Sequence, residues 1–171
     1  MNYIYTFTLP VFVKSLAALD EILVKADGFL KEKGLEESSL LELRLAPDMF
    51  PFKKQVQMIC DNAKGASARL AGMDVPSHED TEQSLSELRA RIEKTLDFLA
   101  TIPESAFEQA ADRQITLPYF PGKYMTGIGY ATEFAVPNFF FHLTTAYALL
   151  RKEGLVIGKS DYLGGLPLKD L

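Results

Sequence analysis

The 171-residue sequence contains one cysteine, Cys60, and two histidines, His78 and His142. A single cysteine excludes a disulfide within the chain and fits a reducing compartment. A catalytic zinc site needs three protein ligands from His, Cys, Asp or Glu, so the shortage of His and Cys leaves few combinations. The candidates for a metal or catalytic role can therefore be considered one at a time.

Clusters of basic residues are also missing. No basic run is longer than the two residues of Lys53-Lys54, and the formal net charge is −5 at pH 7. Nucleic-acid binding depends on clustered Lys and Arg side chains, so we expect no nucleic-acid partner. No apolar run approaches the ~20 residues of a membrane span. The N-terminal segment has neither a basic region nor a cleavage site of small residues, and we expect a cytoplasmic protein with no membrane partner.

The sequence lacks the motifs that mark well-known catalytic centres. It has no Walker loop, no dinucleotide-binding glycine motif after a strand, no HExxH and no nucleophile elbow. The Glu-x-x-His pairs of di-iron helical bundles are missing too. No reaction is therefore predicted from a motif, and the fold has to indicate where a site would lie.

Apolar residues recur every three or four positions in four segments, which is the spacing of amphipathic helices. Ser77 with Asp80 three residues later resembles a capping box and is the expected start of the third segment. Together the segments predict an all-α protein, an antiparallel four-helix bundle that forms a single domain over residues 1–171. The expected helices span about 10–33 and 51–71, then a third that ends before Pro103 and a fourth that ends near Lys152.

The segment between the third and fourth helices is rich in Pro and Gly. Alternating residues in Gln114–Tyr119, a turn, and a returning stretch at Lys123–Thr126 predict a small β-hairpin here. The last helix has two possible starts, because Pro137 either begins it or kinks it. If Pro137 is a kink, Tyr130–Val136 forms the first half of that helix.

The most apolar stretch, Pro137–Leu150, carries an amide, Asn138, and an imidazole, His142. They are four residues apart, about one helical turn, so both side chains leave the same face. Apolar neighbours surround His142 on that face, which predicts a buried and neutral imidazole. Two interpretations stay open. His142 is a core histidine satisfied by Asn138, Asp61 or a backbone carbonyl, or it contacts a ligand or metal.

Three further residues have the chemistry for a site. Cys60 follows the core position Ile59 on the second helix and is expected to be a small buried residue. Asp61 lies at the edge of that core face, where a carboxylate is solvated, paired with a Lys or Arg, or turned toward His142 as a second metal ligand. His78 lies in a loop beside acidic residues and is expected to face solvent.

Aromatic residues gather around the glycine-rich segment that precedes the last helix. Tyr119, Tyr124, Tyr130 and Phe134 are the members of this group. They either form the wall of a pocket beside the bundle or belong to the core or an interface.

With the helices so placed, the chain resembles the DinB/YfiT-like superfamily of four-helix bundles. It is most similar to a member family known only as a domain of unknown function. The resemblance covers nearly the whole chain. It is carried by Leu45–Met49, Gln55–Asp61 with Ala63-Lys64, Pro137–His142, Ala146–Arg151, and Gly158-Lys159 with Asp161–Gly164.

The resemblance implies the place of a site. Metal-binding members use one histidine of the second helix and an H-x-x-x-H pair on the fourth. His142 matches the second histidine of that pair, Asn138 stands in place of the first, and Gln55–Asp61 contains no histidine. We therefore expect no tightly bound cofactor, the alternative being a divalent metal, Zn or Ni, held by His142 and Asp61. Homodimers are common among members, and several members are thiol-dependent transferases or isomerases.

The leading hypothesis is a DinB-like bundle that binds an unknown small molecule near Asn138 and His142, without the usual three-histidine metal site. Tyr119, Tyr124 and Tyr130 are the expected additional contacts. One alternative is a metal- or thiol-dependent transferase or isomerase with an altered site. The other is a non-catalytic bundle with a structural or partner-binding role.

Overall fold

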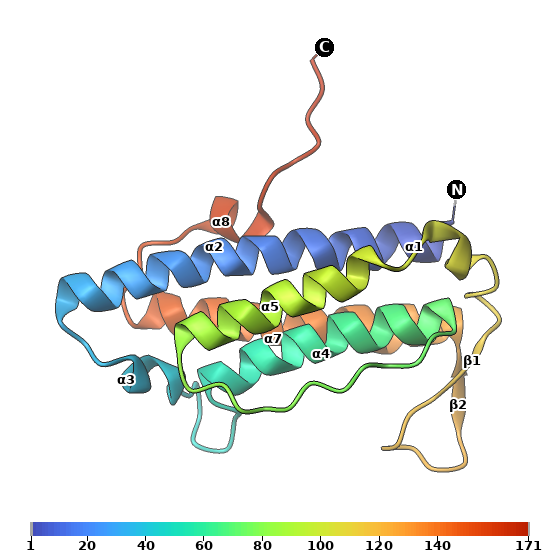
Figure 1. Ribbon diagram of the computed structural model, residues 1–171, viewed down its shortest axis with the longest axis horizontal. Helices are drawn as coiled ribbons and strands as arrows, with labels where there is room; N and C mark the ends of the chain where they lie inside the picture. The colour runs from blue at the N-terminus through green and yellow to red at the C-terminus, as the bar shows by residue number, and fades with distance from the viewer. Residues whose placement is uncertain (1, 171) are drawn as a thin grey trace.

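Four long helices form the body of the protein in the computed structural model, which describes residues 2–170 (Figure 1). Helices α2 and α7 run in one direction, and α4 and α5 run in the other (Figure 1). The predicted all-α bundle is confirmed, with an up-down-down-up order of helices along the chain. The four helices are α2 (Leu9–Lys33), α4 (Phe52–Ala71), α5 (Leu85–Ala100) and α7 (Val136–Lys152).

The parallel arrangement of α4 and α5 requires a long connection. Helix α4 has 20 residues and is therefore about 30 Å long, a distance that the chain must cover again before α5 can begin. Residues 73–84, which we call the return segment, run back along the bundle in an extended form (Figure 1). This segment brings a line of polar residues against α4 and α5.

Smaller elements pack at the two ends of the bundle and along its side (Figure 1). The predicted hairpin is confirmed, with Ile115 opposite Met125 in an antiparallel pair of strands. Helix α8 packs on α2, where Asp161 forms an ion pair with Lys25. These elements are α1 (Tyr3–Phe7), α3 (Glu37–Leu41), the 3-10 turn η1 (Glu104–Phe107), β1 (Gln114–Thr116), β2 (Tyr124–Thr126), α6 (Gly127–Gly129), the π-helix η2 (Tyr130–Ala135) and α8 (Lys159–Leu163).

The apolar stripes predicted for the first two long helices are buried along their whole length. The rings of Phe12 on α2 and Phe139 on α7 meet at the centre of the core, with centroids 4.6 Å apart. Within residues 2–170, no helix combines the length and apolar character that a membrane crossing requires. The buried stripes are Phe12, Leu16, Leu19, Leu23, Ala26 and Leu30 on α2, and Phe52, Val56, Ile59, Ala63, Ala66 and Leu70 on α4.

The predicted start of the third helix was wrong. The helix begins after Ser84, whose Oγ accepts a hydrogen bond from the backbone N–H of Glu87 at 3.1 Å. Ser84 and Glu87 have the spacing of a capping box, so the correct signal lay seven residues beyond Ser77. Asp80 does not cap a helix because its carboxylate forms ion pairs with Lys54 and Arg91.

The last helix continues through Pro137. The π-helix η2 leads directly into α7, so Tyr130–Val136 is helical and Pro137 lies inside a continuous helical segment. Proline has no N–H and its ring crowds the preceding turn, and a wider π turn just before it relieves both problems. The widened turn also sets the position of Tyr130 and Phe134 beside α4.

Two glycines provide a matched test of this packing. A Cβ on Gly127, where the hairpin meets α6, would lie 1.7 Å from the carbonyl oxygen of Ala110. We predict that Gly127→Ala lowers the free energy of unfolding by about 1–3 kcal/mol, because the backbone must move apart. Gly28→Ala, within α2 and with no atom within 4 Å of the new Cβ, should raise it by about 0.5–1 kcal/mol. Urea unfolding measures both, and a shift of the same sign in the two variants would contradict the packing described.

Candidate functional site

Two polar pairs join α4 and α7. The amide of Asn138 donates to Asn62 Oδ1 at 2.8 Å, and one turn further along α7 the His142 Nδ1 lies 2.7 Å from Gln55 Oε1. The Gln55 amide in turn donates to the Phe50 carbonyl oxygen at 3.0 Å. Asn138 and His142 therefore share a helix face as predicted, but they contact different partners.

His142 is a buried histidine with a partner that the sequence analysis did not name for it. Its residue exposure is 6%, and burial lowers the pKa of the imidazole, with the nearby Lys54 adding to this effect. The ring is therefore neutral at pH 7, and Gln55, rather than Asn138, Asp61 or a backbone carbonyl, satisfies its Nδ1.

A pocket of about 490 Å³ lies between α4, η2 and the return segment, on the Asn138 side of the polar pairs. Its apolar surface includes Met58, Val75, Leu117 and the aromatic side chains of Tyr119 and of η2. The residues that line it are Lys54, Met58, Asp61, Asn62, Lys64, Gly65, Arg69, Val75, Ser77, His78, Leu117, Tyr119, Tyr130, Phe134 and Asn138.

The structure brings three of the five predicted ligand-binding residues to this pocket. Tyr119, Tyr130 and Asn138 line it, whereas His142 and Tyr124 do not. Tyr124 is 57% exposed and lines a separate, neighbouring hollow on the hairpin. Burial raises the pKa of Tyr130, and the neighbouring Arg69 opposes that rise, so the phenol stays protonated at neutral pH.

One face of α4 supplies much of the pocket, and sequence reasoning overlooked it. Lys54, Met58, Asp61, Gly65 and Arg69 line the pocket at spacings of four, three, four and four residues. These spacings place the five side chains along one stripe of the helix, beside the apolar core stripe. A second periodic stripe, made of three charged residues, a methionine and a glycine, was visible in the sequence and would have indicated this surface.

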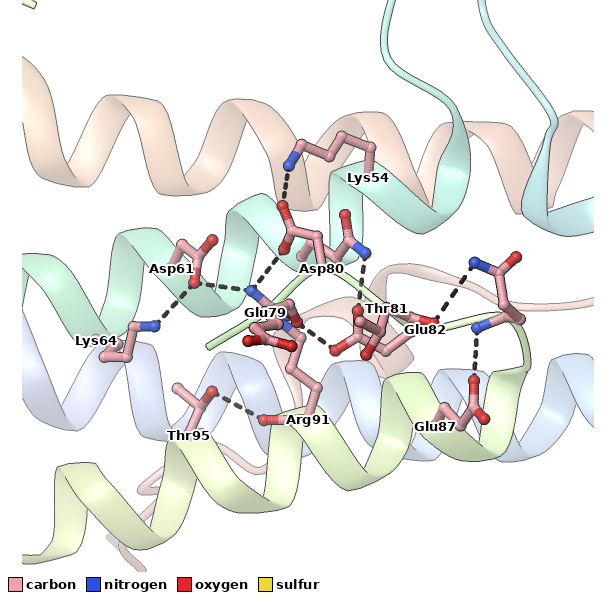
Figure 2. Close-up of polar contacts among 12 residues, drawn as sticks. Lys54, Asp61, Lys64, Glu79, Asp80, Thr81, Glu82, Glu87, Arg91 and Thr95 are labelled. Atoms are coloured by element: carbon pink, nitrogen blue, oxygen red, sulfur yellow. Dashed lines mark hydrogen bonds and ion pairs between the residues drawn. The ribbon is translucent and has the colours of Figure 1, made fainter. Parts of the chain in front are cut away.

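The guanidinium of Arg91 on α5 is surrounded by three carboxylates (Figure 2). Its Nη2 lies 2.9 Å from Asp61 Oδ1 and 3.0 Å from Asp80 Oδ1, and its Nη1 lies 2.8 Å from Glu82 Oε1. The Arg91 side chain is only 2% exposed. We call Arg91 and these three acidic residues the Arg91 cluster.

Further contacts fix the return segment to α4 (Figure 2). The Gln57 amide donates to Glu82 Oε2 at 2.8 Å, and Lys54 pairs with Asp80. Burial alone would raise the pKa of both Asp80 and Glu82, but the cations and hydrogen bonds around them outweigh it and lower both values. Both carboxylates are therefore charged at neutral pH and hold residues 79–82 against α4 and α5.

Two buried polar atoms of the pocket wall have no hydrogen-bond partner within residues 2–170. They are Asn62 Nδ2 and His78 Nδ1. His78 was expected to face solvent, but the ion pairs of Asp80 draw its segment inward and leave it half-buried. Burial lowers the pKa of His78, and the cations Lys64, Lys94 and Arg91 lower it further. The imidazole that faces the pocket is therefore neutral at pH 7.

The residues around His142 do not fit a three-ligand metal site. Nowhere in the described chain do three His, Cys, Asp or Glu side chains come together at a spacing that would hold a metal ion. Asp61 lies six residues beyond Gln55 on α4, roughly 9 Å along the helix axis, and its carboxylate contacts Arg91 and Lys64 instead. The structure therefore does not bring Asp61 to His142, and the absence of a tightly held metal stays a prediction.

The only cysteine is part of the core, as predicted. Cys60 is 0% exposed, and its burial raises the pKa of the thiol to about 12. A hydrogen bond with the Thr95 side chain opposes this rise but does not cancel it. A thiol with this pKa is protonated at neutral pH and is a poor nucleophile. The geometry therefore gives no support to Cys60 as part of an altered thiol-dependent site.

Arg91→Leu should be strongly destabilising, because it leaves the buried carboxylate of Glu82 and the partly exposed carboxylates of Asp61 and Asp80 without their cation. We predict a loss of about 3–5 kcal/mol in the free energy of unfolding at pH 7. Arg89→Leu is the matched control on the same helix, since Arg89 pairs with Asp20 at the surface and its loss should cost no more than about 1 kcal/mol. Equal losses in the two variants would contradict a structural role for the Arg91 cluster.

The same cluster predicts a pH dependence. Asp80 and Glu82 have lowered pKa values in the folded state, so their stabilisation is complete above the unfolded-state values of about 3.9 and 4.3. It is lost as the pH falls through the folded-state values. We expect the wild-type free energy of unfolding to fall below about pH 4 and its difference from Arg91→Leu to shrink there. A difference that stays constant from pH 7 to pH 3 would contradict this account.

Cys60 should be unreactive in the folded protein. We predict no reaction with a thiol reagent such as DTNB at pH 8 in the native state, because both burial and the raised pKa oppose it. One equivalent should react once the protein is unfolded in guanidinium chloride. Rapid reaction of the native protein would show that the thiol is accessible.

Comparisons with known proteins agree with this fold. The family described as "Domain of unknown function (DUF1993)" matches residues 4–163. A crystal structure of a DinB family member protein from Shewanella denitrificans is 44% identical and superposes with a TM-score of 0.94, covering 98% of this chain and 95% of that one. The search of curated proteins found no match. The chain therefore belongs to the DinB-like family of helical bundles described as the domain of unknown function DUF1993.

Proposed function

We propose that this protein binds a small organic molecule in the pocket between α4, η2 and the return segment. The pocket volume of about 490 Å³ falls within the range of about 300–1,000 Å³ typical of small-molecule sites. Its wall combines the aromatic rings of Tyr130 and Phe134 with amide and cationic side chains. Such a mixture of apolar surface and a few polar groups is typical of a ligand pocket.

The unpaired amide nitrogen of Asn62 is the observation that carries the proposal. Asn62 Oδ1 accepts a hydrogen bond from Asn138, which fixes the amide group and leaves its Nδ2 without an acceptor. A buried donor without a partner costs about 1–3 kcal/mol. A ligand with an acceptor atom at this position would remove that cost, so the unsatisfied donor favours binding of such a ligand.

This proposal keeps Asn138 and moves the site away from His142. Asn138 both lines the pocket and orients Asn62. His142 instead forms a hydrogen bond with Gln55 inside the core. The ligand we propose is held by protein groups alone, with no metal. The homodimer implied by the resemblance and the cytoplasmic location expected from composition stay predictions.

The proposal can be tested with two variants from the originally predicted residues. A thermal-shift screen of small molecules should yield compounds that stabilise the wild-type protein. Asn138→Leu should weaken them at least about tenfold, because it removes the group that orients Asn62. Tyr124→Leu is the control, since Tyr124 lies outside the pocket and should leave affinity unchanged.

One outcome would contradict the small-molecule pocket, and another would contradict the expected absence of a metal. One is a set of stabilising compounds whose affinity is unaffected by Asn138→Leu. The other comes from metal analysis of the purified protein. One equivalent of Zn or Ni that is lost in His142→Ala would show that a metal is held after all.

A further inference from the structure

The pocket contains more positive charge than its carboxylates neutralise. Lys54, Lys64 and Arg69 line it together with a single acid, Asp61. Lys54 is already paired with Asp80, which belongs to the Arg91 cluster. Asp61 is shared, because the same Oδ1 atom contacts both Lys64 and Arg91. One carboxylate oxygen thus serves two buried cations.

The ammonium group of Lys64 is the most buried of these cations. Its side chain is 4% exposed, and the one ion pair that it forms within residues 2–170 is the shared contact with Asp61 Oδ1 at 3.0 Å. An ammonium has three protons to donate, and burial of a charge is costly unless it is paired and hydrogen-bonded. A second anion next to Lys64 would therefore be favourable.

Arg69 has no carboxylate within ion-pair distance in the part of the chain that the structure describes. Its guanidinium folds back over Gly65, where a Cβ would lie 2.5 Å from Nη1. The absence of a side chain at Gly65 leaves room for the guanidinium against the helix, next to Tyr130. A planar guanidinium presented in this way is suited to bidentate contacts with a carboxylate or phosphate.

We propose that the ligand of this pocket carries an anionic group, a carboxylate or a phosphate, on a small apolar or aromatic body. This inference rests on the proposed small-molecule function and specifies its chemical class. Lys64 and Arg69 bind the anionic group, and the unpaired Nδ2 of Asn62 donates to it or to a neighbouring acceptor. The body of the ligand lies against Leu117, Tyr130 and Phe134.

Three probes of similar shape separate the contribution of charge to binding affinity from that of shape. Benzoate, phenyl phosphate and benzyl alcohol share one aromatic ring and differ in the group attached to it. Two-dimensional ¹H–¹⁵N NMR titrations of the wild-type protein at low salt give a dissociation constant for each. We expect at least one of the anions to bind about tenfold or more tightly than benzyl alcohol, because charge-assisted hydrogen bonds are the strong ones. The tighter of the two anions identifies the carboxylate or the phosphate as the preferred group.

A pair of variants with equal charge change assigns the effect to the pocket. Arg69→Met should weaken the preferred anion about tenfold and leave benzyl alcohol unaffected. Lys152→Met, at the exposed end of α7, removes the same charge away from the pocket and should leave both affinities unchanged. The wild-type comparison of probes needs neither variant, so it stands even if a substitution impairs folding.

The outcomes separate this inference from the function on which it rests. If benzyl alcohol binds as tightly as both anions, the anionic class is wrong and the small-molecule pocket stands. The anionic class is also wrong, and the small-molecule pocket stands, if the screened compounds whose affinity depends on Asn138 are neutral or cationic. If neither these probes nor any screened compound binds in the pocket, both proposals are wrong.

Discussion

The guanidinium of Arg91 is held inside the protein by Asp61, Asp80 and Glu82, and this contact sets the course of the chain between α4 and α5. A buried cation needs carboxylates around it, because an uncompensated charge in the interior is strongly destabilising. Two of the three carboxylates come from the return segment, so residues 79–82 must lie against both helices. The parallel order of α4 and α5 depends on that segment, since it carries the chain back along the bundle.

The pocket follows from the same constraint. The ion pairs of Asp80 hold the preceding residues, including Ser77 and His78, over the pocket as one of its walls. The contact between Arg91 and Asp61 also divides the charge of that carboxylate between Arg91 and Lys64. One cluster thus builds the wall and leaves the pocket cationic. This connects the stability of the bundle to the chemistry of the ligand that we propose.

Much of the fold was predictable because the core depends on local periodicity, which a single sequence contains. The stripes of α2 and α4, the hairpin and the buried Cys60 all follow from spacing and residue type. The site was less predictable because its contacts join residues distant in sequence. The pairing of His142 with Gln55, and of Arg91 with carboxylates from two elements, depends on helix order and rotation, which periodicity does not determine. The inward position of His78 was unpredictable for the same reason, since it depends on the ion pairs of Asp80 with Lys54 and Arg91.

The cations around the pocket are incompletely neutralised, and the change in the pKa of His78 when an anion binds tests this most directly, because burial lowers that pKa in any case. The chain has two histidines, so a pH titration of the ring signals by NMR resolves each one. The account predicts a pKa for His78 below the ordinary value of about 6.5 in the free protein. That pKa should rise when phenyl phosphate is added, whereas the pKa of His142, which lies outside the pocket, stays unchanged. A His78 pKa that does not rise when phenyl phosphate fills the pocket would contradict the incomplete neutralisation of these cations.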